Sequence, residues 1–456
     1  MSDELPQGWA SAPLGRLSRP TRPRRNPHEY PRLPFVGMEQ VESHTRRLLG
    51  TLSSSEMKST AFHFQPGDVL YGRLRPYLNK VLCADIEGLC SSEFIVLPPQ
   101  PGFEPKYLAF YLSTDGFVSF ANQLNQGDRP RVSFDQIADH EIPLPPLSEQ
   151  RRIVAKLETL LGKVDACQQR LGKIPILLKR FRQAVLAAAC SGRVTADWRE
   201  DRATDDPDDT DRKTSVKPAK SVVKDSGDDL PDTWRTAELS EFIESSFYGP
   251  RFSKESYSTK GIPTVRTTDM GFDGSIVLKH SPCISLSKTE LEKFGLQHGD
   301  LVVTRTGATI GKCALYHKSL GPAIPGAYLI RFRFKRDAIV PKFALRFLMS
   351  PAGQQLLVGG STAVAQPNVN ATTISQFIIP IPPLAEQQEI VRRVEALFAL
   401  AAQIEARLGQ ARAQVDQFTP SLLAKAFRGQ LVPQDPNDEP ASALWERIRH
   451  QRKASS

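Results

Sequence analysis

The stretch 143-PLPPLSEQRRIVAKLE-158 decides the fold, because nearly the same text returns as 380-PIPPLAEQQEIVRRVE-395. Glu149, Gln150 and Glu158 are among the residues that recur at a constant offset of 237 positions. An internal repeat at a fixed period indicates a duplicated structural unit. The chain is therefore expected to contain two copies of one domain.

The repeat extends over most of the chain. The strings 5-LPQGW-9 and 230-LPDTW-234 are offset by 225 residues, whereas 67-GDVLYGR-73 and 299-GDLVVTR-305 are offset by 232. The matches stay in order while the offset rises, as insertions in the loops of a duplicated domain would produce. Two further pairs are 105-PKYLAFYL-112 with 341-PKFALRFL-348 and 184-AVLAAACSGRV-194 with 421-SLLAKAFRGQL-431.

This order predicts two α/β domains, here called the readers, each followed by a long helix. Short β-like runs alternate in the readers with helical runs, and Gly, Pro and Asp separate them. The predicted strands are 68–72, 93–97, 300–304 and 328–334, and the predicted short helices are 105–113, 341–349 and 441–452. The predicted boundaries are readers at 1–145 and 230–381, long helices at 146–195 and 382–431, an acidic linker at 196–229 and a C-terminal tail at 432–456.

The two long helices carry an apolar seam. Its spacing alternates between four and three residues, and the second helix repeats the pattern except at Lys425. A seam sustained over several heptads favours a coiled coil over two helices that each pack on their own domain. Pro175 and Pro420 are expected to kink or break the helices, at roughly 3 kcal/mol each, and Gly192 and Gly429 are expected to end them. The spacer positions are Ile153, Leu157, Leu160, Val164, Leu171, Ile390, Val394, Leu397, Ile404 and Leu408.

Composition and charge restrict the class of protein. With 456 residues, 40% hydrophobic and 24% charged, the chain is expected to form two or three globular domains. The net charge of +9 favours a polyanionic partner, and because residues 197–232 carry a net −5 the remainder carries +14. The six cysteines form no CxxC pair, which predicts reduced thiols in a cytoplasmic protein. The start MSDELPQGW lacks the features of a signal peptide, and no apolar run approaches the ~20 residues that cross a bilayer.

Catalytic motifs are absent from the sequence. The string 305-RTGATIGKC-313 approaches a phosphate-binding P-loop, but its glycines are one residue too close and Cys313 stands where the motif needs Ser or Thr. A turn between two strands, with projecting basic residues, is predicted instead. Glu290, Glu292 and Lys293 are typical of an exposed helix face rather than of a nuclease site. No His or Cys cluster has metal-ligand spacing, so no catalytic residue, metal site or bound cofactor is expected in this chain.

Polar loops at equivalent places in the two readers are candidates for DNA contact. The loop that begins at Arg73 matches the loop that begins at Arg305. Arginines of a second loop suit phosphates or guanine, and amide side chains of its counterpart suit adenine edges. The candidate DNA-binding residues are Arg73, Arg75, Lys80, Arg129, Arg131, Arg266, Thr267, Arg305, Thr306, Lys312, Gln366, Asn368 and Asn370, with Thr268 beside them.

Together these features resemble the specificity subunits of type I restriction-modification systems. The doubled PPLxEQ helices carry most of the resemblance. The two helix endings, the strings LPQGW and LPDTW, and 305-RTGATIGK-312 agree with it. The resemblance covers almost the whole chain and departs from the family pattern at Lys425 and in the long acidic linker.

The resemblance implies a non-catalytic subunit that binds double-stranded DNA. Each reader would be a target-recognition domain for one half of a split target, and the helices would form an antiparallel coiled-coil spacer. Two methyltransferase subunits would dock on the chain and methylate adenine N6 with S-adenosylmethionine. Restriction subunits would add ATP- and Mg-dependent translocation and cleavage. The tail is expected either to be a short docking helix for a methyltransferase subunit or to be frayed.

Physical dimensions agree with a spacer. From Ser148, the expected N-cap of the first helix, to Leu171 a helix would span roughly 36 Å at about 1.5 Å per residue, and one turn of DNA is roughly 34 Å. The different loops of the two readers predict unlike half-sites and hence an asymmetric target. Two alternatives stay open. A coiled-coil scaffold that never binds DNA leaves the +14 outside the linker unexplained, and a self-contained nuclease or ATPase needs a motif that this sequence lacks.

Overall fold

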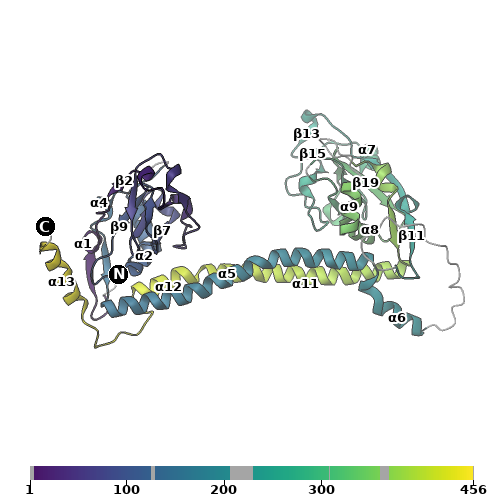
Figure 1. The fold of residues 1–456 in the computed structure, drawn as a ribbon. Helices are drawn as coiled ribbons and strands as arrows, with labels where there is room; N and C mark the ends of the chain where they lie inside the picture. The colour runs from purple at the N-terminus through teal and green to yellow at the C-terminus, as the bar shows by residue number, and fades with distance from the viewer. Residues whose placement is uncertain (1–4, 125–128, 206–229, 308, 360–368, 455–456) are drawn as a thin grey trace. The chain divides into compact units, whose positions relative to one another are not determined.

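The computed structural model describes residues 5–124, 129–205, 230–307, 309–359 and 369–454. The chain divides into two compact units, the first made of Met1–Gly172 with Leu408–Ser456 and the second of Lys173–Arg407. Each unit contains one reader together with segments of both long helices, α5 (Leu147–Cys190) and α11 (Leu384–Asp416) (Figure 1).

The first reader is built on three small sheets. Its strands are β1 Ala10–Pro13, β2 Arg24–Arg25, β3 Pro34–Val36, β4 Leu52–Ser53, β5 Ala61–Phe64, β6 Val69–Gly72, β7 Val81–Cys83, β8 Gly88–Cys90, β9 Phe94–Leu97 and β10 Glu141–Leu144. The helices of the unit, besides α5, are α1 Leu14–Leu17, α2 Pro105–Leu112, α3 Asp115–Gln123, α4 Phe134–Ile137, α12 Phe418–Phe427 and α13 Ala441–Ala454, with 3-10 turns η2 Met38–Gln40 and η4 Pro76–Leu78. The sheet orders are β2-β5-β8-β3-β4, β7-β6-β9 and β1-β10.

The second reader repeats this plan. Its strands are β11 Arg235–Glu238, β12 Ile243–Tyr248, β13 Tyr257–Ser258, β14 Ile262–Val265, β15 Cys283–Ile284, β16 Leu301–Thr304, β17 Cys313–Leu315, β18 Ile324–Pro325, β19 Leu329–Phe334 and β20 Ile378–Ile381. The helices of the second unit, besides α5 and α11, are α6 Ala196–Asp205, α7 Lys288–Phe294, α8 Pro341–Met349, α9 Pro351–Gly359 and α10 Ala371–Ser375, with the 3-10 turn η9 Thr267–Asp269. The sheet orders are β12-β19-β16-β17, β13-β15-β14-β18 and β11-β20.

The predicted α/β character of the readers is confirmed, and so are the individual elements. The four predicted strands correspond to β6, β9, β16 and β19, and the predicted reader helices to α2 and α8. In each reader the entering strand pairs antiparallel with the strand that leads into the long helix, with Ala10 opposite Leu144 and Arg235 opposite Ile381. This pairing brings the two ends of each reader together at the start of its helix.

The repeated Gly-Asp step has a structural purpose. The Asp68 carboxylate accepts two bonds from the Arg22 guanidinium, both at 2.7 Å, and the Asp300 carboxylate accepts two from Arg333, at 2.9 and 2.8 Å. Both aspartates are buried, and each also accepts a main-chain N–H from three residues earlier. Buried carboxylates need such partners, so this step supports the strand that follows it rather than forming an active site.

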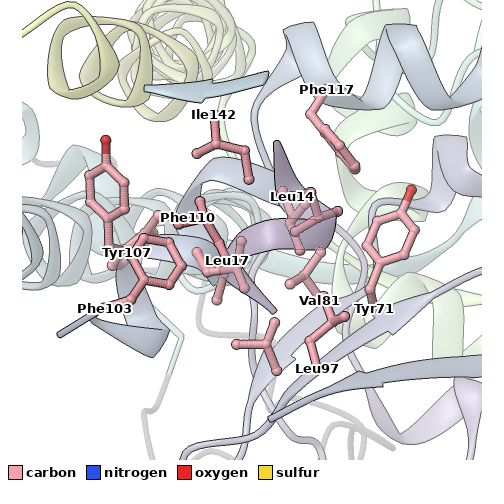
Figure 2. Close-up of a cluster of buried hydrophobic side chains, with 14 of the residues drawn as sticks. Leu14, Leu17, Tyr71, Val81, Leu97, Phe103, Tyr107, Phe110, Phe117 and Ile142 are labelled. Carbon is pink, nitrogen blue, oxygen red and sulfur yellow. The ribbon is translucent and has the colours of Figure 1, made fainter. Parts of the chain in front are cut away.

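The core of the first unit joins the reader to both helices. Leu14, Leu17, Val81 and Leu97 gather with aromatic rings in one buried cluster (Figure 2). The same cluster contains side chains of α5, α12 and α13. The second unit has an equivalent cluster to which α5 and α11 contribute. Each reader therefore packs on the first turns of its own helix and the last turns of the other, which explains why the helix endings repeat.

The long helices pair antiparallel within both units, which confirms the predicted coiled coil. In the second unit Arg182 donates two bonds to Glu405, at 2.7 and 2.9 Å. In the first unit Gln168 Nε2 donates to Asp416 Oδ1 at 2.9 Å. The buried spacer positions are Ile153, Leu157, Val164, Ile390, Val394 and Leu408, the half-buried ones Leu160, Leu171 and Leu397, and the exposed one Ile404.

Pro175 does not break its helix, because α5 runs without interruption from Leu147 to Cys190; the expected kink stays a prediction. A proline lacks the N–H that would bond the carbonyl four residues earlier, here that of Leu171. Arg412 Nη2 donates to this carbonyl oxygen at 3.1 Å and so replaces the missing partner. Near Pro420 the helix does break, since α11 ends at Asp416 and α12 begins at Phe418.

Two boundaries differ from expectation, whereas the tail agrees with one of the two alternatives for it. The first helix begins at Leu147, so Ser148 is not its N-cap, and the Ser148 hydroxyl instead donates to Asp438 Oδ1 at 2.7 Å. The start of the acidic linker is helical, as α6, while residues 206–229 lie outside the described part. The tail forms the predicted helix, α13, and it is not frayed, because Ala441, Leu444 and Ile448 are buried in the first unit.

Candidate nucleic-acid interface

A tryptophan–glutamate hydrogen bond, part-buried in the first unit and buried in the second, ties the entry of each reader to the start of its helix. Trp9 Nε1 donates to Glu149 Oε2 at 3.0 Å, and Trp234 Nε1 donates to Glu386 Oε2 at 2.9 Å. A hydrogen bond to an ionised acceptor is worth more than one between neutral groups. The strings LPxxW and PPLxEQ therefore repeat together because their side chains are partners.

The neighbouring glutamine adds a second tie at the same place. Gln150 Oε1 accepts the main-chain N–H of Glu104 at 2.9 Å, and Gln387 Oε1 accepts that of Val340 at 2.8 Å. Each glutamine also donates its amide N–H to the carbonyl of the first proline of its Pro-Pro step, at 2.9 and 3.0 Å. Because Glu104 and Val340 are the N-caps of α2 and α8, these bonds fix a reader helix against the long helix.

The two copies of the glutamate have different partners. Glu386 Oε1 accepts the Thr195 hydroxyl at 2.7 Å and also pairs with Arg199. Glu149 Oε1 is buried and has no hydrogen-bond partner among the described residues. Burial raises the pKa of the Glu149 carboxyl above its ordinary value. The second reader therefore has more hydrogen bonds at this glutamate to hold it to its long helix than the first reader has.

Arg73 and Arg305 occupy the same position, directly after β6 and β16. The Arg73 carbonyl accepts the N–H of Val132 at 3.0 Å, and the Arg305 carbonyl accepts that of Val369 at 2.9 Å. The backbone thus brings the turn after each strand to a loop more than fifty residues later. Both side chains are half-buried, and the Nε of each lacks a hydrogen-bond partner among the described residues. Leaving a buried donor without a partner costs about 1–3 kcal/mol.

Three other basic candidates have intramolecular partners. Lys80 Nζ donates to the Met38 carbonyl at 2.5 Å and Lys312 Nζ to the Thr267 carbonyl at 3.1 Å. These two lysines are repeat equivalents, and each anchors its turn to a 3-10 turn, η2 or η9. Arg266 holds Asp269 through Nε at 3.1 Å and Nη2 at 2.9 Å.

The second candidate loop is only partly described. Arg131 Nη2 pairs with Glu93 Oε1 at 2.6 Å, and Arg129 is exposed. Asn370 caps α10 by accepting the Thr373 N–H at 2.8 Å. Thr306 is half-buried in the turn after β16. Gln366 and Asn368 lie outside the described residues.

Sequence reasoning missed a group of left-handed residues beside the first of these turns. Besides the candidate Arg75, these are His44, Arg46 and Asn79, with φ values of 66°, 62° and 46°, and Arg75 has 52°. The His44 N–H donates to the Asn79 carbonyl at 3.0 Å, which joins the two segments. Non-glycine residues in this region store strain and gather at functional sites. Sequence offers no signal for them, because none is glycine.

Arg46 is held within the first reader, and its neighbour Arg47 contacts the long helix. Its guanidinium lies 4.9 Å from the Phe110 ring centroid and donates to the Ser113 hydroxyl at 3.1 Å. Burial lowers the pKa of Arg46 to about 10. The next residue, Arg47, pairs with Asp165 of α5.

Within the described residues, no group of three or more His, Cys, Asp or Glu side chains is arranged to hold a metal ion. The same part of the chain contains no helix long and apolar enough to cross a membrane. Glu290, Glu292 and Lys293 lie exposed on α7, as expected of a solvated helix face.

A family model for the type I restriction modification DNA specificity domain matches residues 14–175 and 231–411. These ranges contain nearly all of both readers and most of α5 and α11, while β1 lies just before the first range. The chain therefore belongs to the family of type I restriction-modification DNA specificity subunits, as its repeated motifs had indicated.

Several characterised relatives are similar over most of their length. The chain is 35% identical over 359 residues to the EcoBI specificity subunit of Escherichia coli. This alignment covers 76% of this chain and 72% of the relative. It is 34% identical over 381 residues to the EcoKI specificity subunit of Escherichia coli strain K12, covering 79% and 74%.

Solved structures share the fold. A chain from work on complex assembly and conformational transition of the type I R-M system superposes with a TM-score of 0.72 at 22% identity, covering 94% of this chain and 99% of that one. The HsdS subunit from Thermoanaerobacter tengcongensis superposes with a TM-score of 0.61 at 22% identity, covering 94% and 98%. Members of this family act in complexes with other subunits and DNA, and this chain belongs to the family.

Proposed function

We propose that the two readers of this chain recognise the two unlike halves of a split, asymmetric DNA target. One observation carries the proposal: a single scaffold is used twice and presents different side chains at equivalent positions. Arg73 and Arg305 share their place and their main-chain bonds. The turns that they begin differ, since the first contains η4 and left-handed Arg75 and Asn79 and the second contains glycines at 307 and 311. In this proposal, contacts to the DNA phosphates position each reader, and the side chains that differ between the readers specify the bases.

The chain has no catalytic role of its own in this proposal. It would direct two methyltransferase subunits to the target, where they methylate adenine N6 with S-adenosylmethionine. Restriction subunits would supply Mg- and ATP-dependent translocation and cleavage. This chain would bind none of these cofactors. The antiparallel helices would act as the spacer that sets the gap between the half-sites.

The test is co-expression with the partner methyltransferase, followed by single-molecule sequencing of host DNA for N6-methyladenine. We expect a bipartite motif with a fixed gap. Replacing residues 73–80 should change only one half of the motif, and replacing residues 305–312 should change only the other. Each replacement is the matched control of the other.

Two results would contradict the proposal. Methylation that persists unchanged without this chain would mean that it is not the specificity element, and a scaffold role would then take first place. A symmetric or ungapped motif would show that the readers do not recognise separate, unlike half-sites.

A further inference from the structure

Three aromatic side chains of the second reader are exposed around one turn. Tyr248, Phe272 and Tyr328 have exposed fractions of 42%, 82% and 58%. A single exposed apolar residue is ordinary. These three, however, all contact or adjoin the turn 305–312 that connects β16 and β17.

The ends of the turn hold two of the rings through cations. The Arg305 guanidinium lies 4.9 Å from the Tyr248 ring centroid, and the Lys312 ammonium lies 4.6 Å from the Phe272 ring centroid. The Arg305 N–H also donates to the Tyr328 carbonyl at 3.1 Å. Each end of the turn therefore places a cation beside an exposed aromatic ring.

Phe272 is presented by a tightly bonded loop. The Asp273 carboxylate accepts the N–H and the hydroxyl of Ser275, at 3.0 and 2.6 Å. Arg346 Nη1 donates to the Asp273 carbonyl at 3.1 Å, and the Leu315 N–H donates to the Gly274 carbonyl at 3.2 Å. Gly274 has a φ of 87°, and a Cβ there would lie 2.8 Å from Leu345. Because hydrogen bonds anchor this loop to both α8 and β17, the loop holds the Phe272 ring in solvent.

The chemistry around Phe272 suits a nucleobase with its phosphate. A base stacks on an aromatic ring, and a cation beside the ring pairs with the backbone of the same nucleotide. Protein–protein interfaces, by contrast, deplete lysine around their aromatic anchors. The ammonium of Lys312 over the ring thus favours nucleic acid as the occupant.

The first reader lacks this device in the corresponding loop. The isolated bridge between Val41 and Leu48 matches the one between Met270 and Ile276. The loop enclosed by the first bridge contains His44, Arg46 and Arg47 and no Phe, Tyr or Trp. Any contact made through Phe272 is therefore specific to the half-site of the second reader.

We propose that Phe272 is a wedge that stacks into a base step of this half-site and opens it, while Lys312 pairs with the adjoining phosphate. Apolar side chains inserted between base steps unstack them and kink the duplex. Flexible pyrimidine–purine steps are opened most easily, so we expect such a step at this position of the target. The inference rests on the proposed function, because it requires the second reader to bind DNA.

The test uses the complex of the full chain with its methyltransferase subunits and target duplexes that contain 2-aminopurine. The probe replaces one base at a time in the half-site of the second reader. With the native chain we expect a rise in fluorescence at the wedge position and a separate rise at the adenine that the methyltransferase extracts. Phe272→Ala should abolish the first rise, preserve the second, and weaken binding roughly 10- to 100-fold.

Two further variants make the result specific. Lys312→Ala should reduce the salt dependence of binding by about one phosphate contact, which Phe272→Ala should leave unchanged. Val277 lies close by and is 49% exposed, so Val277→Ala is the matched control and should alter neither fluorescence nor affinity.

The outcomes separate the two proposals. If the complex does not bind the target at all, the proposed function fails. If it binds and Phe272→Ala changes neither the probe signals nor the affinity, the wedge is refuted and the function stands. Loss of the methyltransferase subunits from the Phe272→Ala complex would also overturn the wedge, because the ring would then be a protein contact.

Discussion

Substituting Glu386→Gln removes the charge that unites the second reader with its helix. In the native chain this buried carboxylate accepts bonds from Trp234, Thr195 and Arg199. Breaking a buried ion pair costs about 3–5 kcal/mol. We expect a cost at the low end of this range, about 3 kcal/mol. The Arg199 side chain is 20% exposed, so water partly solvates its charge after the pair is broken. This loss corresponds to a roughly 150-fold larger equilibrium constant for local opening.

The matched substitution Glu149→Gln should cost under about 1 kcal/mol. One oxygen of this buried carboxylate has no partner among the described residues, and burial raises its pKa. A raised pKa means that the charged form opposes folding, and that stability grows as pH falls. Glutamine at position 149 would weaken the hydrogen bond from Trp9, but it would also remove the cost of burying a charge, so the two effects largely offset each other.

The assay is hydrogen exchange of the full chain, followed by mass spectrometry. We expect Glu386→Gln to accelerate exchange in β20 and α8, and Glu149→Gln to leave β10 and α2 within about fivefold of the native rates. Equal acceleration in both units, or a larger effect of Glu149→Gln, would refute the reasoning, because the difference in partners would then have no energetic consequence.

Three further predictions concern contacts between distant segments. Arg412→Ala should remove the partner of the Leu171 carbonyl, cost about 1 kcal/mol and speed exchange near the helix proline; unchanged exchange there would contradict this. Gln387→Ala should cost about 1–3 kcal/mol and shift urea unfolding of the second unit; a shift of the first unit instead would oppose it. The Arg152 guanidinium holds the pKa of the Asp438 carboxyl below its usual range, so this ion pair stabilises the tail above the ordinary pKa of Asp and is lost as pH falls through the folded value. Proteolysis of the tail between about pH 6 and pH 2 should show release at the acidic end, and Arg152→Ala should show it already at neutral pH.

The repeat, the readers, the long helices and four of the described strands were predictable from the sequence. They depend on local or periodic signals: the heptad seam, the Pro-Pro steps, the glycines after each helix and the apolar runs of β6, β9, β16 and β19. The candidate site was predictable only as a set of loops. Arg73 and Arg305 were found because they recur, whereas His44, Arg46 and Phe272 were missed because neither a left-handed backbone nor an exposed ring has a sequence signal.

By itself, the sequence determined that one scaffold is used twice and that paired helices connect the copies. Only the tertiary structure decided which distant residues bond to the buried polar groups of each copy. Pro175 lies in an unbroken helix because Arg412, distant in the chain, donates to the carbonyl that the proline leaves unmet. Glu149 and Glu386 stand in equivalent motifs, but Thr195 and Arg199 contact only the second one. Local patterns specify elements, but a buried polar group is satisfied by whichever distant segment the fold brings to it, and no repeat in the sequence records that partner.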